Sequence, residues 1–481
     1  MIVILVFILI VSILFGQASV ANDLHLQLSL VFIVWIFNVL FACFKIKKRF
    51  IFFSFHMTFF LFLLGEIFAA NLEGYKQDFS SVINNFSIPI KSHIYFSLFL
   101  SLVGLLLGGK IFDSSKKTKL SFDWSSNGIV ELRQLSRKML LFLYVFKFIL
   151  EIEKVFYVAA TSYVDLYLSF NSNFPIIFVR LADIYSISFL LFLATMPSYK
   201  EAKLPILLYF ILGLFPLIYG QRTNFGLIVL FVLIYLILRK SLSLNGDGNL
   251  WFNKRRLLVV VISIPFVLIG FLAISYIRQG ESFHNTGILH SLVSILGQQG
   301  GSVGIIGYEK VYGSQMPQTF PFSLGFIVDF FKNSFLIRPL GLFDYYAPQT
   351  EGLAMHGLSF GSTLSYLVMP QYYLSGGGLG SCYIAEAYHD YGYIGLFLVN
   401  LFYGFIFNVF NRNLSSVWIV FSSLLIVENI LIIPRGNSLD FLRCFFSYTL
   451  LFYIYFMYKY KQRKENNSKL RCNKNNTIYG N

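Results

Sequence analysis

Long, uninterrupted apolar runs recur along the whole chain. Twelve of them approach or reach the length of about 20 residues that a helix needs to cross a bilayer. With 56% hydrophobic and only 13% charged residues, the 481-residue chain carries more apolar surface than a soluble domain can bury. Membrane β-strands alternate apolar and polar side chains, and these runs do not, so a β-barrel is excluded. The sequence therefore predicts an all-α polytopic membrane protein.

The twelve predicted membrane helices divide the chain unevenly. They cover residues 2–19, 27–44, 50–70, 94–109, 139–160, 176–195, 205–219, 225–238, 257–276, 392–410, 415–433 and 439–458. Helices one to nine thus occupy residues 1–276, a loop without a spanning run occupies 277–391, helices ten to twelve occupy 392–458, and a basic tail follows at 459–481. The first run also resembles a signal peptide, because Ser19-Val20-Ala21 is a small-residue cleavage signal, but no Lys or Arg precedes it and an uncleaved helix is favoured.

The distribution of basic residues predicts the orientation. With the N-terminus inside, the inner loops and the tail hold 26 of the 38 Lys and Arg residues. The loop 277–391 then faces outward, with four basic and seven acidic residues. We therefore expect a membrane protein with both termini on the inner side and the large loop between helices nine and ten on the outer side. The net charge of +15 reflects orientation and anionic lipid headgroups, not nucleic acid.

Four arginines lie at or beyond the predicted outer face, against the inside-positive bias. They are Arg222, Arg278, Arg338 and Arg435. Arginine forms bidentate contacts with phosphate and keeps its charge, so the set predicts a cradle for a pyrophosphate-linked substrate. Interfacial snorkelling, or ion pairs with the acids of the loop, explains any single one of them equally well.

Titratable groups cluster just before the tenth predicted helix, in the stretch SGGGLGSCYIAEAYHDYGYIGL. If the chain is helical from Ile384, then Glu386, His389 and Asp390 share one face. A carboxylate or imidazole there is a candidate general base, with Glu386 and His389 favoured. The alternative is a solvated cap on the helix. The glycine run at 376–380 follows no strand and is interpreted as a flexible turn.

Charged residues also lie inside the predicted membrane helices. Lys147, Glu151, Glu153 and Lys154 belong to the fifth, and Glu66, Arg180, Asp183 and Glu428 to others. Such charges usually pair with each other within the bundle or face a polar cavity. On the second interpretation we expect a hydrophilic cavity that holds a lipid-linked sugar. No outer loop contains a DxD triplet, and Walker A, HExxH and GxSxG motifs are absent. We therefore expect neither metal nor cofactor.

This combination resembles the bacterial O-antigen polymerases, the oligosaccharide repeat-unit polymerases called Wzy. The resemblance rests on many spans, one large late outer loop, the stretch GLGSCYIAEAYHDYGYIGL before a helix, the turn Gly220-Gln221-Arg222-Thr223-Asn224, and Arg435-Gly436. Some members carry a Gly eleven residues after an Arg in two outer loops. This chain has Leu289 and Gln349 at those positions after Arg278 and Arg338.

The resemblance implies a metal-independent glycosyltransferase of lipopolysaccharide or capsule biosynthesis. It also implies a bacterial inner membrane protein with both termini in the cytoplasm and the large loop in the periplasm. Its substrates would be undecaprenyl-pyrophosphate-linked oligosaccharides, and it would work with a flippase and a chain-length regulator. Arg278 and the other arginines would stabilise the leaving pyrophosphate, and Glu386 or His389 would take the proton of the acceptor hydroxyl. An O-antigen ligase shares the fold and the donor. A flippase is disfavoured, because it would show two similar halves and no large outer loop.

Overall fold

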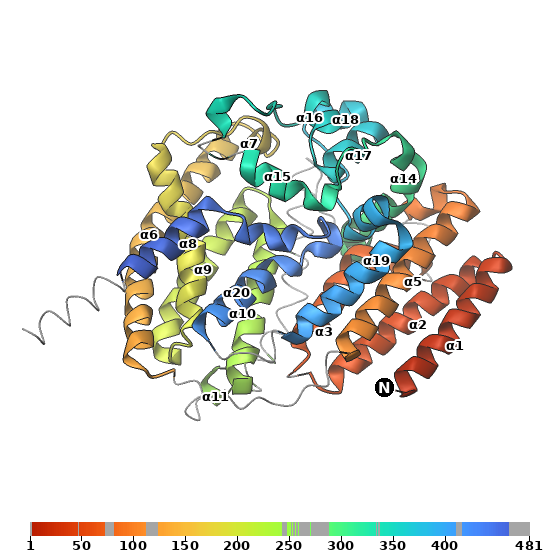
Figure 1. The fold of residues 1–481 in the computed structure, drawn as a ribbon, viewed down its shortest axis with the longest axis horizontal. Coiled ribbons are helices and arrows are strands. Elements are labelled where there is room, and N and C mark those ends of the chain that lie inside the picture. The colour runs from red at the N-terminus through yellow and green to blue at the C-terminus, as the bar shows by residue number, and fades with distance from the viewer. Residues whose placement is uncertain are drawn as a thin grey trace, which may run out of the picture.

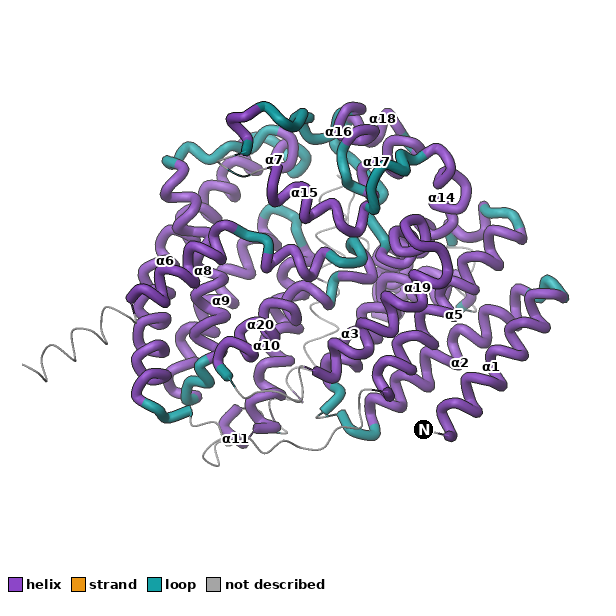
Figure 2. The backbone as a smooth tube through the Cα atoms, viewed as in Figure 1, coloured by secondary structure: helices purple, strands orange, loops and turns teal. Residues whose placement is uncertain are grey.

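The computed structural model describes residues 2–46, 48–72, 81–111, 124–242, 248–251, 288–332, 334, 337–409 and 416–460, with single positions at 253, 255, 258 and 270. Helices joined by short loops make up this part of the chain, and no strand occurs within it (Figures 1 and 2). The predicted all-α class is confirmed.

Eight helices in the described residues are long and apolar enough to cross a membrane. They are α1 (Ile2–Val20), α2 (Leu24–Cys43), the combined helix Phe50–Asn71, α5 (Ile88–Ile111), α8 (Ile176–Ala194), α9 (Tyr199–Ile218), α10 (Arg222–Leu242) and α19 (Tyr383–Val409). Each coincides with a predicted apolar run. The chain is therefore an integral membrane protein.

The remaining predicted spans have different outcomes. The fifth is part of α6 (Asn127–Ala160), a 34-residue helix that begins twelve residues before the predicted run and carries several charges. The eleventh corresponds to α20 (Val417–Ile430), whose 14 residues are too few for a full crossing. Of the ninth, 257–276, only the single positions 258 and 270 are described, and the tail beyond residue 460 lies outside the described residues.

The prediction of one continuous twelfth helix over 439–458 is wrong. A 3-10 helix, η9 (Asp440–Phe445), comes first, and a separate helix begins at residue 448. Phe441 turns into the core here, whereas Asp440 and Arg443 stay at the surface and approach each other to 3.7 Å. Tertiary packing of one aromatic side chain thus outweighs the apolar composition of the run.

The predicted loop 277–391 contains short helices. They are α13 (Ile288–Gly300), α14 (Gly304–Tyr312), α15 (Gly325–Lys332), α16 (Glu351–His356), α17 (Phe360–Val368) and α18 (Pro370–Leu374). Helices α14 to α18 gather at one end of the bundle, next to α7 (Asp165–Leu168), and the N-terminus and α11 (Gly248–Trp251) lie at the opposite end (Figure 1).

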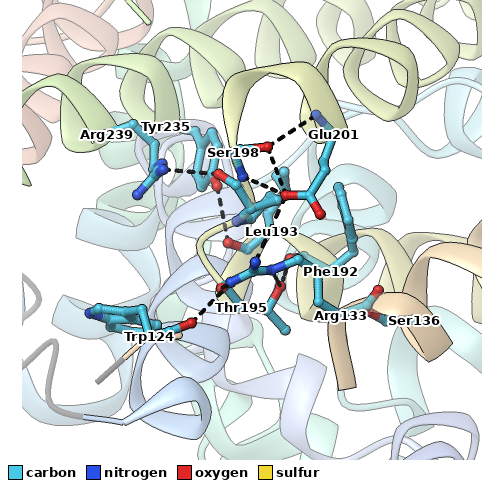
Figure 3. A network of polar contacts seen from close by, with 11 residues as sticks. Trp124, Arg133, Ser136, Phe192, Leu193, Thr195, Ser198, Glu201, Tyr235 and Arg239 are labelled. Atoms are coloured by element: carbon cyan, nitrogen blue, oxygen red, sulfur yellow. Dashed lines mark hydrogen bonds and ion pairs between the residues drawn. The ribbon is translucent and has the colours of Figure 1, made fainter. Parts of the chain in front are cut away.

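Two arginines, the partly buried Arg133 and the buried Arg239, stabilise the end opposite the loop. Arg133 of α6 donates to the carbonyl oxygen of Thr195 at 2.8 Å, and its guanidinium lies 3.8 Å from the Glu201 carboxylate. Arg239 of α10 donates to the carbonyl oxygen of Pro197 at 2.9 Å. These contacts converge on the turn between α8 and α9 (Figure 3). Some of the basic residues at this end therefore stabilise the fold directly.

Helices α5 and α19 pack at unusually close range. A Cβ on Gly108 would lie 2.1 Å from the carbonyl oxygen of Leu401, and one on Gly404 would lie 2.5 Å from the backbone nitrogen of Gly109. Small residues allow membrane helices to approach in this way. Helix α19 bends at Gly392, whose φ of 64° suits glycine. Its first part, 383–391, is therefore a separate helical segment above a tightly packed spanning part.

Candidate active site

Glu386 holds the segment that carries Arg435. Its side chain is 0% exposed, and the Ser438 hydroxyl donates to its Oε2 at 2.7 Å. The Ser438 backbone N–H donates to the same oxygen. Oε1 of Glu386 has no hydrogen-bond partner among the described residues. Because buried carboxylates are costly unless hydrogen-bonded, this contact fixes the turn 435–438 relative to α19.

Arg435 lies at the meeting point of three elements. It ends η8 (Ile433–Arg435), and its Nη1 donates to Oε1 of Gln299, near the end of α13, at 2.9 Å. Its guanidinium also lies 6.0 Å from the centre of the Phe62 ring. Phe62 belongs to η1 (Phe60–Leu64), a π-helical turn within the third membrane helix. Such turns interrupt the regular ladder and often occur at functional sites.

A cavity of about 540 Å³ borders the same segment. We call it the serine–glycine cavity, because its walls include glycines of the run at 376–380, three serines of α17 and its N-cap, Ser381 directly after the glycine run, and Asn437. Tyr163, Tyr373 and Gln349 complete its polar and aromatic lining. Hydroxyl, amide and aromatic groups are those that hydrogen-bond and stack on sugar rings. The glycine run predicted as a flexible turn is thus a cavity wall.

A second cavity, of about 380 Å³, lies among the membrane helices. We call it the lysine cavity, because Lys147 and Lys154 of α6 line it together with Glu151. Both ammonium groups contact one oxygen of Glu151, at 3.1 and 3.0 Å, and the Tyr219 hydroxyl donates to the other at 2.8 Å. Glu428 of α20 also lines the cavity.

One stretch of chain borders both cavities. Glu428, Asn429 and Ile432 line the lysine cavity, and Asn437 lines the serine–glycine cavity. Arg435 lies between these positions in the chain. Its side chain lines neither cavity and instead contacts Gln299 and Phe62. The turn that carries Arg435 joins the lining of a polar cavity among the membrane helices to the lining of a polar cavity beside α17 and α18.

The three titratable residues at the start of α19 have three different partners. Glu386 binds Ser438, as described above. Nδ1 of His389 lies 3.3 Å from Oε1 of Glu309, and the backbone N–H groups of Phe322 and Ser323 donate to Asp390 at 3.0 and 2.8 Å. The predicted helix is present, but its acidic and basic side chains do not form one cluster, and none of the three lines either cavity.

The pairing of His389 with Glu309 was not predicted. Both side chains are nearly buried, at 7% and 6% exposed, and the imidazole packs beside the rings of Phe322 and Phe360. Gly313 leaves room for the pair, because a Cβ there would lie 2.6 Å from Oε1 of Glu309. The only sequence signal for Glu309 was its acidic charge within the loop.

For the other three predicted arginines, the structure gives less information about the position of the side chain. Arg338 is exposed in η7 (Arg338–Leu340) and lies 4.9 Å from the centre of the Tyr345 ring, away from the lining of both cavities. Arg222 begins α10 directly after Gln221, which lines the lysine cavity, but its side chain is not among those described. Arg278 lies outside the described residues.

Some of the charged residues within the predicted membrane helices face a polar cavity, and others pair with neighbouring groups, so each of the two interpretations holds for part of the set. Glu151 and Glu428 face the lysine cavity. Glu153, two residues from Glu151, instead accepts from the Ser172 hydroxyl at 2.6 Å and from the Asn173 backbone at 2.7 Å. Glu66 accepts from the backbone of Val82, and Arg180 and Asp183 form an exposed pair.

The family model for the O-antigen polysaccharide polymerase Wzy matches residues 1–466, nearly the whole chain. The chain belongs to the Wzy family. Neither a curated protein nor a solved structure matches it. Wzy proteins act in the membrane on lipid-linked oligosaccharide repeat units, which they polymerise. The chain is accordingly a polymerising, glycosyltransferase-type enzyme of polysaccharide biosynthesis, and the family resemblance read from the sequence is confirmed.

Proposed function

We propose that this Wzy protein joins undecaprenyl-pyrophosphate-linked repeat units into O-antigen or capsule-type polysaccharide at the periplasmic face of the bacterial inner membrane. The observation that carries the proposal is the place of Arg435 on the short segment 428–437, whose two ends line the lysine cavity and the serine–glycine cavity. In this proposal the glycan lies among the serines, tyrosines and Asn437 of the serine–glycine cavity. The polyprenyl chains lie among the membrane helices.

The reaction is a displacement at the anomeric carbon of the donor sugar. The acceptor hydroxyl oxygen forms the new glycosidic bond, and the bond from carbon to pyrophosphate oxygen breaks. Undecaprenyl pyrophosphate leaves with the electron pair, and the hydroxyl proton goes to a protein base. Arg435 stabilises the charge that develops on the pyrophosphate. We propose three further contacts: Arg222, which follows Gln221 of the lysine cavity in the chain, and Arg278 and Arg338, from their place in the sequence.

His389 is the base that we propose. If Nδ1–H donates to Glu309, the neutral ring keeps Nε2 as the acceptor of a proton. The ring packs beside Phe360, and the residues on both sides of Phe360, Ser359 and Gly361, line the serine–glycine cavity. Glu386, which the sequence favoured equally, is proposed as a positioning residue because its carboxylate is occupied by Ser438.

The orientation and the partners follow the same proposal. Arg49 directly precedes α3 (Phe50–Phe59), and Lys110 and Arg239 lie in the last turns of α5 and α10, near the end of the bundle opposite α14 to α18 (Figure 1). We assign that basic end, with both termini, to the cytoplasm. A flippase would deliver the lipid-linked units to the loop side, and a chain-length regulator would act on the growing product.

The test uses the purified protein in nanodiscs, with a short undecaprenyl-pyrophosphate-linked repeat unit and EDTA. The proposal predicts a ladder of regularly spaced products that EDTA does not suppress. Transfer to added lipid A core without a ladder would identify a ligase instead. Movement of the lipid-linked unit across liposomes without either product would identify a flippase.

A further inference from the structure

The lysine cavity has an excess of cationic groups on one wall. The ammonium groups of Lys147 and Lys154 share a single carboxylate oxygen, Oε1 of Glu151. Another part of the lining, on α20, carries Glu428, whose Oε1 accepts from the Tyr209 phenol at 2.8 Å. Among the described residues, no lysine lies within ion-pair distance of Glu428. One carboxylate therefore serves two lysines on α6, which leaves one positive charge in excess there, and Glu428 on α20 brings the formal charge of the whole lining to zero. The local excess on α6 is where an anion would bind.

The lysines are more accessible than the acid that holds them. Their side chains are 26% and 25% exposed, against 5% for Glu151. The Tyr219 hydroxyl holds the second oxygen of Glu151 in place. An ammonium group on a flexible four-carbon chain can therefore turn to an incoming anion while Glu151 stays fixed.

A long helix also begins at the cavity. Gln221 and Asn224, which flank the first residue of the 21-residue α10, line it. Unpaired backbone N–H groups and the helix dipole favour negative charge at such a terminus. The helix start and the lysine pair, on α10 and α6, are independent features that favour the same kind of ligand.

The rest of the lining suits an amphiphile. Leu212, Pro216, Leu227, Ile228 and Ile432 supply apolar surface beside the charged groups. Lys147 lies 13 residues before the end of α6, or about 20 Å along the helix axis. An anion attached to a hydrocarbon chain matches this combination better than a free phosphate ion.

We propose that the lysine cavity binds the pyrophosphate group of a polyprenyl-linked substrate, as a second site besides the one at Arg435. The inference rests on the proposed function, because joining two lipid-linked units brings two pyrophosphate groups into one enzyme. Lys147 and Lys154 hold one of them within the membrane, and Arg435 holds the reacting one.

Native mass spectrometry of the purified full chain with undecaprenyl pyrophosphate tests the proposal. The wild-type protein binds two molecules. The double variant Lys147→Met with Lys154→Met binds one, and the affinity at the lost site falls about tenfold or more. Lys138→Met removes an exposed lysine of the same helix and leaves two molecules bound. Unchanged stoichiometry and affinity in the double variant would overturn the inference.

A variant with the opposite sign separates ligand binding from misfolding. Glu151→Gln keeps an acceptor for Tyr219 but removes the competing charge, so binding at the lysine cavity tightens by severalfold at low salt. Misfolding does not tighten binding, and weaker binding in a folded Glu151→Gln protein would contradict the proposal.

Competing ligands identify the source of the phosphate. We expect undecaprenyl phosphate to compete, and inorganic pyrophosphate to compete weakly. Equal binding of phosphatidylglycerol would overturn the proposal in favour of a general lipid site. The product ladder is measured in parallel. If the double variant still binds two molecules and still gives a ladder, this inference alone is refuted. If the wild-type protein binds two molecules but gives no ladder, only the proposed function is refuted.

Discussion

The hydroxyl and the backbone N–H of Ser438 both donate to one oxygen of Glu386, which lies 52 positions earlier in the chain. This contact joins the first segment of α19 to the turn that carries Arg435 and Asn437. It connects the stretch rich in titratable groups with the segment that borders both cavities. Glu386 therefore has two possible roles: its charge could accept a proton in the reaction, or its hydrogen bonds to Ser438 could hold the turn 435–438 in place.

Substitution of Glu386 separates these two roles. Glu386→Gln keeps a carbonyl oxygen for Ser438, so a positioning residue should retain much of its activity. Glu386→Ala leaves the buried groups of Ser438 without an acceptor, which costs about 1–3 kcal/mol and abolishes polymer formation. The product ladder and the thermal stability of both variants check this. Complete loss in a stable Glu386→Gln protein would instead identify Glu386 as the base.

The contact between His389 and Glu309 predicts the effects of a second set of substitutions on the rate of polymerisation. His389→Ala should reduce polymerisation about a hundredfold or more, because the proposed base is removed. Glu309→Gln should reduce it less, by roughly tenfold, since the imidazole keeps a hydrogen-bond partner but loses the charge beside it. Initial rates of product formation measure both.

The control for that series is His356→Ala, since His356 is an exposed histidine of the same loop, in α16. Normal product formation is expected from it. Equal activity of His389→Ala and His356→Ala would remove His389 from the mechanism.

Close packing of α5 against α19 predicts a stability effect without any change in charge. Gly108→Ala places a Cβ 2.1 Å from the Leu401 carbonyl oxygen, so the two helices must separate. Overpacking of this kind typically costs about 1–3 kcal/mol, and the thermal unfolding temperature in detergent should fall. Gly16→Ala, in α1, meets nothing within 4 Å and should leave that temperature unchanged. Equal melting of the two variants would show that the close approach is absent.

The sequence predicted what depends on local composition. Continuous apolar runs marked the membrane helices, and the helix that carries Glu386 begins at Tyr383, close to the expected Ile384. The run 439–458 failed because burial of Phe441 breaks it into two pieces. Apolar content does not show whether a helix continues or turns.

The site was less predictable because its contacts join distant parts of the chain. Glu386, His389 and Asp390 share a helix, yet each binds a residue from another segment. Spacing along the helix indicated a common face, and their partners depended on the folding of η6 (Phe322–Leu324), α14 and η8 around it. Nor did the glycine run carry a signal that it would form the wall of a cavity.

Substitution of Arg435 tests the central claim most directly. The product ladder of Arg435→Ala and Arg435→Lys is compared with that of the wild type at matched protein levels. Arg180→Ala, which removes an exposed arginine paired with Asp183, is the control. The account predicts no polymer from Arg435→Ala, partial activity from Arg435→Lys, because charge survives without the bidentate fork, and a normal ladder from Arg180→Ala. A wild-type ladder from Arg435→Ala would contradict the account.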